Sequence, residues 1–277
     1  MKKRSVIRYW RALDASDGAG VKLKRALGAS AEVRMDPFLM LDAFASDNPD
    51  DYIAGFPAHP HRGFETVTYI IDGHMQHKDH LGNQGDLQTG GVQWMTAGRG
   101  IIHEEMPQQQ NGLLRGFQIW LNLPAQDKMQ PAHYTDVPAS AMPWQALEAG
   151  GEIKLIAGVA EHNRLLADAK RVTAPIIADV KLASGEEVLT LPEAHQALVY
   201  VLEGEVSIGG QRLTETATAL LSEGESLVVH ADQPARMLLL AGAPLNEPVV
   251  QYGPFVMNTV EEINQAITDY RNGTLTA

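Results

Sequence analysis

The chain has 277 residues, of which 34 are acidic and 22 are basic, and its net charge is −12 with histidine neutral. This acidic balance argues against nucleic acid or an anionic membrane as the partner, because both attract basic protein faces. There is no cysteine, which excludes disulfides and thiolate metal sites. Any metal ion must therefore be bound by His, Asp or Glu.

The amino terminus is basic, but Arg8 and Arg11 interrupt the apolar residues that follow it. No signal-peptide core is therefore predicted. No uncharged apolar stretch approaches the roughly 20 residues that a membrane span needs. We expect a cytoplasmic protein, and a monomer, since no long apolar face stands out beyond the predicted strands.

Short β-type runs follow one another along the chain, separated by Gly, Pro, Asn and Asp at intervals of about ten residues. The 25 Gly and 15 Pro supply the turn residues that such a fold requires. This spacing predicts antiparallel strands in a sandwich or barrel. The predicted strands are 64–71, 116–123, 154–159, 197–202, 205–208, 219–221 and 226–229.

Two segments share one pattern. In 59–74 and again in 193–206, a histidine precedes an apolar strand that ends in an acidic residue and Gly. This repetition suggests an internal duplication of one β-barrel unit. A proline-rich stretch over 124–143 lies between the two segments and predicts a boundary there. We therefore expect domains at 1–135 and 136–277.

One helix is predicted near the C-terminus. Thr259 is the expected N-cap and Glu262 stands at the capping-box position, while Gly273 ends the helix. The expected buried stripe consists of Val260, Ile263, Ile267 and Tyr270.

The histidines of the first half carry the chemistry. His59 and His61 are two residues apart, so on a strand both imidazoles point to one face. His103 and Glu105 share the same spacing about forty residues later. If neighbouring antiparallel strands bring the pairs together, three imidazoles and one carboxylate surround one point. That donor set suits Fe, Mn, Ni, Cu or Zn.

The other polar residues of this region have weaker patterns. His74 and His80 share a strand parity that His77 lacks, so we expect all three to be mostly exposed or to support the ligands. Glu65 has the parity of His61 and is either a ligand or a supporting carboxylate. Glu104 should point away from its neighbours. The isolated histidines are expected to be structural or exposed: His133, His162 and His230.

Residues 55–67 and 91–107 resemble the two metal motifs of the pirin family, a branch of the cupin superfamily. Residues 35–44, 116–124 and 253–259 resemble further family segments. The resemblance implies an all-β bicupin, with two stacked antiparallel jelly-roll barrels and a short C-terminal helix. It also implies one metal ion in the N-terminal barrel.

Carried over to this chain, the family ligands are His59, His61, His103 and Glu105. Thr96 stands where cupins usually have Pro, and Glu65 occupies the general cupin ligand position whose role looks transferred to Glu105. The second barrel offers only His195 where a His-x-His pair would be expected. We therefore predict no metal ion there.

The resemblance to bacterial members implies a quercetin 2,3-dioxygenase, which cleaves a flavonol with dioxygen and releases carbon monoxide. Glu105 would accept the proton of the substrate hydroxyl group. Fe(II) is the preferred ion, with Mn, Ni, Cu or Zn as alternatives. Eukaryotic family members suggest another class, a metal-dependent regulatory module that contacts a protein partner without catalysis.

Several side chains near the two motifs are candidate substrate contacts. Arg62 and Arg99 either hold an anionic group or are bound by solvent or a carboxylate. Apolar side chains either line a slot for a flat aromatic molecule or fill the core. These apolar residues are Phe56, Phe64, Trp94, Met95 and Met106.

Overall fold

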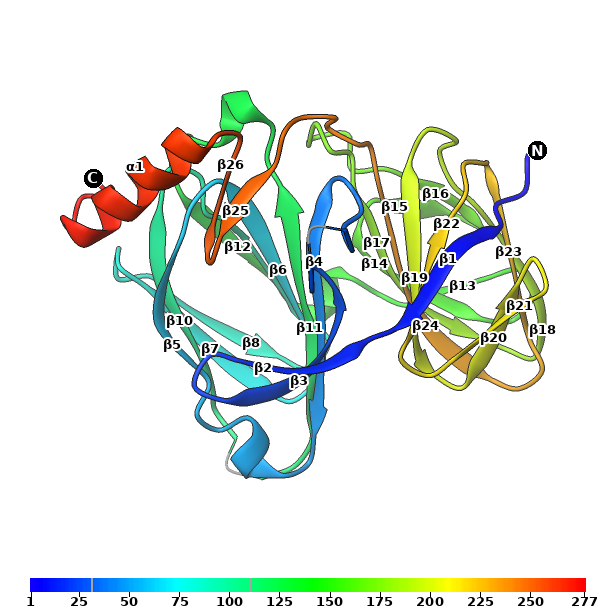
Figure 1. The fold of residues 1–277 in the computed structure, drawn as a ribbon. Coiled ribbons are helices and arrows are strands. Elements are labelled where there is room, and N and C mark those ends of the chain that lie inside the picture. The colour runs from blue at the N-terminus through cyan, green and yellow to red at the C-terminus, as the bar shows by residue number, and fades with distance from the viewer. Residues whose placement is uncertain (31, 110) are drawn as a thin grey trace. The chain divides into compact units, whose positions relative to one another are not determined.

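The structure is a computed structural model that describes residues 1–30, 32–109 and 111–277. The predicted all-β class with a C-terminal helix is confirmed (Figure 1). The strands are joined by turns and by three short 3-10 helices, η1 (Pro49–Asp51), η2 (Ala125–Asp127) and η3 (Ala139–Ala141). None of the helices in these described ranges has the length and apolar character that crossing a membrane requires.

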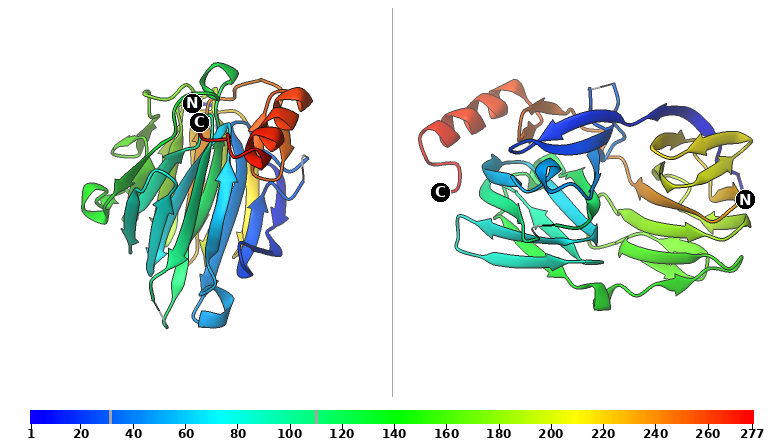
Figure 2. Two further views of the ribbon diagram at one scale, coloured as in Figure 1. Left: turned by 90° about the vertical axis from the view of Figure 1, so that its left-hand side faces the viewer. Right: turned by 90° about the horizontal axis from the view of Figure 1, so that it is seen from below.

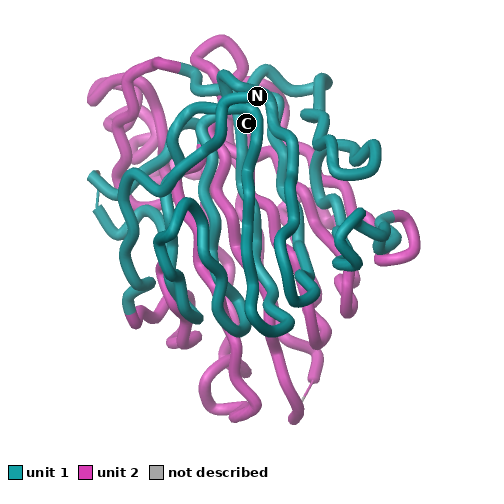
Figure 3. Tube along the Cα trace, turned by 90° about the vertical axis from the view of Figure 1, so that its right-hand side faces the viewer, with its two compact units in different colours: residues 1–13, 26–37, 142–245 teal, residues 14–25, 38–141, 246–277 magenta. Residues whose placement is uncertain are grey.

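The chain forms two compact units, each built from separate segments (Figure 3). Unit 1 consists of Met1–Leu13, Ala26–Pro37 and Met142–Leu245. Unit 2 consists of Asp14–Arg25, Phe38–Ala141 and Asn246–Ala277, so the C-terminal segment belongs to it. The division of the chain into two consecutive domains, 1–135 and 136–277, stays a prediction.

Unit 2 contains a seven-stranded and a four-stranded sheet, and a small hairpin. The large sheet has the order β12 (His133–Val137), β9 (Val92–Thr96), β6 (Phe64–Asp72), β11 (Leu114–Asn122), β4 (Phe38–Ser46), β3 (Val21–Leu27) and β2 (Leu13–Asp17). The small sheet has the order β5 (Phe56–His61), β10 (Ile101–Pro107), β7 (His74–Asp79) and β8 (Gln84–Gln88). The hairpin pairs β25 (Val250–Tyr252) with β26 (Phe255–Met257).

Unit 1 also contains two sheets. The seven-stranded sheet has the order β1 (Val6–Arg11), β22 (Ala217–Leu221), β19 (Gln196–Glu203), β24 (Ala235–Gly242), β17 (Ile176–Leu182), β14 (Glu152–Ala157) and β13 (Gln145–Ala146). The six-stranded sheet has the order β15 (Val159–Glu161), β16 (Arg164–Leu166), β18 (Gly185–Thr190), β23 (Ser226–Ala231), β20 (Glu205–Ile208) and β21 (Gln211–Thr214).

All seven predicted strands are present, with ends that differ by at most two residues. Some of the strands missing from the prediction are rich in polar residues, whereas others, such as β4 and β24, are largely apolar. β5 has the sequence FPAHPH and β7 has HMQHKD, and neither shows an apolar strand pattern. Such strands form because a neighbouring strand supplies their hydrogen bonds, which propensity alone does not predict.

The expected duplication is visible in the strand order of each unit. The run β9, β6, β11, β4 of unit 2 corresponds to β22, β19, β24, β17 of unit 1. The run β5, β10, β7, β8 corresponds in the same way to β18, β23, β20, β21. Each unit therefore repeats one arrangement of eight strands in two sheets.

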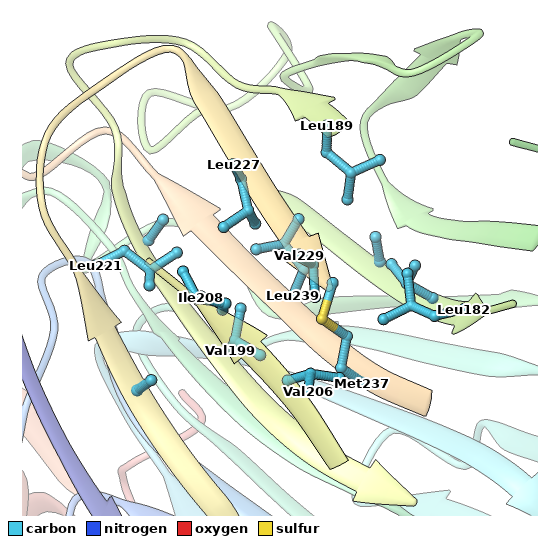
Figure 4. Close-up of a cluster of buried hydrophobic side chains, with 14 of the residues drawn as sticks. Leu182, Leu189, Val199, Val206, Ile208, Leu221, Leu227, Val229, Met237 and Leu239 are labelled. Atoms are coloured by element: carbon cyan, nitrogen blue, oxygen red, sulfur yellow. The ribbon is translucent and has the colours of Figure 1, made fainter. Parts of the chain in front are cut away.

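The interior of unit 1 is an apolar cluster between its two sheets (Figure 4). Aliphatic side chains of β19 and β24 in the large sheet, such as Val199 and Leu239, pack with Leu189 of β18 and Leu227 of β23 in the other sheet. These four side chains are fully buried. Alternate residues of each strand point inward, which is the pattern that two packed sheets require.

The C-terminal helix α1 (Val260–Arg271) lies beside the hairpin β25–β26 of unit 2, as both views of Figure 2 show. Thr259 and Glu262 form the predicted capping box, and Gly273 follows the helix with φ +71°. The predicted stripe is only partly correct. Ile263 is buried, but Val260 and Tyr270 are exposed, because the helix packs through Ile263 and Ala266 instead.

Candidate metal centre

Strands β5 and β10 bring the predicted histidines together. They pair antiparallel, with His103 opposite His59 and Ile101 opposite His61. The ring centroid of His59 lies 4.6 Å from that of His61 and 4.5 Å from that of His103. The rings of His61 and His103 are 5.0 Å apart. The expectation that neighbouring antiparallel strands join the two motifs is thus met for the three imidazoles.

Glycine turns at the ends of β5 and β10 set this geometry. Gly63 follows β5 with φ +89°, and a Cβ there would lie 2.0 Å from the Val256 carbonyl oxygen. Gly98 precedes β10 with φ +51°, and a Cβ would lie 2.2 Å from the Gln130 carbonyl oxygen. An L side chain fits neither position. The chain therefore enters and leaves the histidine strands along fixed paths.

Glu105 lies on the same face of β10 as His103 and is 3% exposed. Its Oε1 accepts a hydrogen bond of 3.1 Å from the Thr68 hydroxyl group of β6. The Thr68 hydroxyl group also lies 2.6 Å from the amide oxygen Oε1 of Gln118. Because a hydroxyl group has one proton, Thr68 donates to one of these two oxygens at a time. This chain of polar groups orients the carboxylate.

Glu105 also lies next to a fourth histidine. His77 of β7 pairs with Glu105 in the sheet, and its Nδ1 lies 3.4 Å from Oε1 of the carboxylate. The structure therefore contains two groups of possible ligands that share one residue, His59–His61–His103 and His77–His103–Glu105. In each group the candidate ligand atoms lie within 4.8 Å of one another.

These donors fit a transition-metal ion. Among the described residues, Nε2 of His103 is buried without a hydrogen-bond partner, and neither ring nitrogen of His61 has a partner with good hydrogen-bond geometry, although the Pro254 backbone lies close to this ring. Burial lowers the pKa of His61 and of His103 well below the ordinary histidine value, with neighbouring imidazoles adding to the effect. Both rings are therefore neutral near pH 7, which is the form that binds a metal ion. An unpartnered buried nitrogen is costly unless a ligand satisfies it.

The expectation that His74, His77 and His80 are mostly exposed or support the ligands is wrong about the exposure of His77. The place of His77 beside Glu105 leaves the supporting role as a prediction. His80 is exposed and His74 pairs with Asp86, but His77 is only 4% exposed. Along β7 the buried residues are Met75 and His77. Met75 and His77 share one strand face, and an apolar Met75 on that face could have indicated that His77 is buried. His74 and His80, which have the opposite strand parity, made the segment look exposed.

The remaining carboxylates have structural partners. Glu65 is buried and accepts a hydrogen bond of 2.7 Å from the Thr96 hydroxyl group. Glu104 is partly exposed and lies 3.9 Å from Nζ of Lys78, on the opposite face of β10 from Glu105. The three isolated histidines, His133, His162 and His230, all lie at exposed positions.

A small pocket opens beside the histidines and encloses about 210 Å³, including some open solvent. His77 and His103 line it together with Met95, Ile101 and Tyr134, and its polar rim includes Asp79, Asn83 and Gln93.

Of the five apolar candidates for substrate contact, Met95 lines this pocket. Phe64 packs on Trp120, with ring centroids 4.3 Å apart, and belongs to a core cluster. Phe56 packs against a separate core cluster. The alternative interpretation as core residues is therefore correct for both phenylalanines.

Arg62 has the carboxylate partner that the sequence left open. Its Nη1 lies 2.7 Å from Asp269 of α1, and it also donates to the carbonyl oxygens of Leu275 and Arg99. Arg62 is 3% exposed. Because Arg62 directly follows His61, these contacts attach the C-terminal segment to the end of the histidine strand β5. Arg99, by contrast, is exposed.

Lys128, to which no sequence motif pointed, has a buried amine that contacts the same region. Its Nζ donates to the carbonyl oxygens of Gly63 and Val256 and to Asn122, at 2.6, 3.1 and 2.6 Å. Burial lowers the pKa of Lys128 to about 8. The turn after β5 is thus fixed by two buried basic side chains: Arg62 binds the C-terminal segment, and Lys128 binds the carbonyl oxygen of Gly63.

The chain is similar to known proteins over nearly its full length. A family model described as Pirin matches residues 20–121, and one described as Pirin C-terminal cupin domain matches residues 177–276. A Pseudomonas aeruginosa protein named "Putative quercetin 2,3-dioxygenase" is 50% identical over 98% of both chains. A Vibrio cholerae protein with the same name is 43% identical over 98% of both chains.

A solved structure extends the likeness to three dimensions. The crystal structure titled quercetin 2,3-dioxygenase from Acinetobacter baumannii covers 99% of this chain and 99% of its own, with a TM-score of 0.89 and 36% identity. The match spans both units and the C-terminal helix, so the two-domain cupin architecture is shared over the full length.

Proposed function

This chain belongs to the pirin family and has its bicupin fold, and from that premise we propose that it is a metal-dependent quercetin 2,3-dioxygenase. The substrates are a flavonol such as quercetin and dioxygen, and carbon monoxide is released. The observation that carries the proposal is the group of three imidazoles, two of them buried and His59 partly buried, with an adjacent carboxylate beside a pocket. The names of the relatives support the reaction class.

We assign the metal ligands to His59, His61, His103 and Glu105. Three neutral nitrogens and one carboxylate suit a divalent first-row ion, and Fe(II) is our preferred ion. When bound, the ion supplies positive charge that stabilises the deprotonated hydroxyl oxygen of the flavonol.

The protein side chains perform the remaining tasks. Glu105 accepts the hydroxyl proton of the flavonol, and the hydrogen bond from Thr68 keeps its carboxylate in place. The sheet pairing of β5 and β10 fixes the positions of the histidines before substrate arrives. The walls formed by Met95 and Ile101 offer an apolar surface to an aromatic ring and restrict water.

The test is aerobic turnover of quercetin by protein loaded separately with Fe(II), Mn(II), Ni(II), Cu(II) or Zn(II), with carbon monoxide measured in the headspace. At least one ion should give metal-dependent release. His59→Ala and Glu105→Ala should lower turnover by about 100-fold or more, as expected when a ligand or a general base is lost.

The matched control is Glu104→Ala, which removes the neighbouring carboxylate on the opposite face of β10. This variant should keep at least half of the activity. One tightly bound ion per chain without carbon monoxide under any loading would refute the dioxygenase proposal. That result would favour the regulatory module that contacts a protein partner.

A further inference from the structure

His77 is a buried polar side chain to which the proposed reaction gives no role. Neither of its ring nitrogens has a hydrogen-bond partner among the described residues, although the side chain is only 4% exposed. Its Nδ1 is close to the Glu105 carboxylate, but the contact of 3.4 Å lacks hydrogen-bond geometry. Buried imidazoles normally have partners, so this one points to an absent ligand.

The position of His77 defines what that ligand meets. Its ring centroid lies 6.3 Å from that of His103, and both residues line the pocket. Met95, Ile101 and the ring of Tyr134 give the pocket largely apolar walls.

The other polar groups of the pocket already have partners. Gln93 donates to Asp136 at 2.8 Å, while Asp79 accepts from the backbone of Leu81 and from Asn83. Lys78 pairs with Glu104. Among the described polar residues of the pocket outside the proposed metal ligands, His77 and the hydroxyl group of Tyr134 are left to bind a polar group of an incoming molecule, and His77 is the more buried of the two.

We propose that His77 is a substrate-orienting residue that hydrogen-bonds a phenolic hydroxyl group of the aromatic substrate, within the pocket beside His103. The room inside the pocket is about that of one water-sized group, so it admits a hydroxyl group of the substrate rather than a whole ring. This inference rests on the proposed function, because it takes a hydroxylated aromatic molecule as substrate.

The test measures equilibrium binding of quercetin without turnover. Nickel-loaded protein is titrated with quercetin under nitrogen and followed by tryptophan fluorescence quenching, and metal content is measured for every variant. His77→Phe should weaken quercetin binding five- to tenfold, as the loss of one hydrogen bond predicts. His77→Gln should recover part of the loss, because it restores a hydrogen-bonding group. His74→Phe, on the same strand outside the pocket, is the matched control and should bind as the wild type does.

Flavone, which has the ring system without hydroxyl groups, separates hydrogen bonding from packing. Its affinity should be equal for the wild type and His77→Phe. An unchanged quercetin affinity, an equal loss for flavone, or a loss of nickel in His77→Phe would each overturn the proposal. The last result would make His77 a metal ligand.

The failures of the two proposals are distinguishable. Quercetin that binds in a His77-dependent way without release of carbon monoxide would refute only the dioxygenase reaction. Turnover with an unchanged affinity in His77→Phe would refute only the role of His77. A wild-type protein that does not bind quercetin would overturn both.

Discussion

The two compact units repeat one strand order, but corresponding inward-facing positions hold apolar side chains in unit 1 and histidines with a glutamate in unit 2. The glycine turns allow the two interiors to be compared position by position. Gly100 before β10 has φ +157° and Gly224 before β23 has φ +154°, while Gly73 and Gly204 precede β7 and β20. The residues equivalent to His59, His61, His103, Glu105 and His77 are Leu189, Leu191, Leu227, Val229 and Ile208, in that order.

The register of the pairs supports this alignment. Leu227 pairs with Leu189 in unit 1, as His103 pairs with His59 in unit 2. In the same alignment His195 corresponds to Phe64. The expectation that His195 stands where a His-x-His pair belongs therefore requires correction, because Leu189 and Leu191 occupy those positions.

The comparison teaches that one strand framework accepts two kinds of interior. In unit 1 the apolar side chains stabilise the fold by their own burial. In unit 2 several buried ring nitrogens have no hydrogen-bond partner among the described residues, which is what a site that binds a ligand requires. A stable core and a binding site thus differ here in a few inward-facing residues.

The largest expected effect comes from replacing His103 of unit 2 with leucine, the residue that unit 1 has at the equivalent position 227. His103→Leu removes the residue that both ligand groups share and should lower bound metal from about one ion per chain to below 0.1. Metal analysis after dialysis measures this. His80→Leu is the exposed control. Retention of stoichiometric metal by His103→Leu would show that the ion binds elsewhere.

The second effect concerns the core of unit 1. Leu227→Ala leaves a cavity among fully buried side chains and should lower the free energy of unfolding by about 2–5 kcal/mol. Chemical denaturation measures the loss, and metal content should not change. A loss below 1 kcal/mol would mean that this core relaxes around the cavity.

The third effect depends on pH and arises at Lys128. With a pKa lowered to about 8 in the folded protein, Lys128 binds fewer protons there than in the unfolded chain between pH 8 and about 10.4. Stability therefore rises with pH across that window through this residue. The difference in unfolding free energy between the wild type and Lys128→Met should rise by about 1–3 kcal/mol from pH 7.5 to 10. A flat difference would contradict the lowered pKa.

The smallest effect concerns the anchor of the C-terminal helix. Asp269→Asn removes the carboxylate that pairs with buried Arg62 and should lower stability by about 1–2 kcal/mol. The hydrogen bond from Arg62 lowers the pKa of Asp269, so this contribution is present above about pH 4 and is lost as the pH falls through that lowered pKa. Hydrogen exchange of α1 and thermal unfolding measure the change. Glu261→Gln, exposed on the same helix, should have a smaller effect.

The sequence by itself determined the local features of this protein. Strand periodicity predicted seven strands to within two residues, and the Thr259–Glu262 capping box predicted the helix start. The parity of His59 with His61, and of His103 with Glu105, follows from the two-residue repeat of any strand. These predictions succeeded because each depends on residues that are close together in the chain.

Only the tertiary structure decided what covers each face. His77 has an ordinary place in a polar strand, and its burial comes from β10 and from the large sheet. Arg62 and Lys128 gained their partners from segments far away in sequence. Whether a polar side chain contacts water, a metal ion or a carboxylate depends on which strands from distant parts of the sequence surround it. The local sequence pattern does not specify those strands.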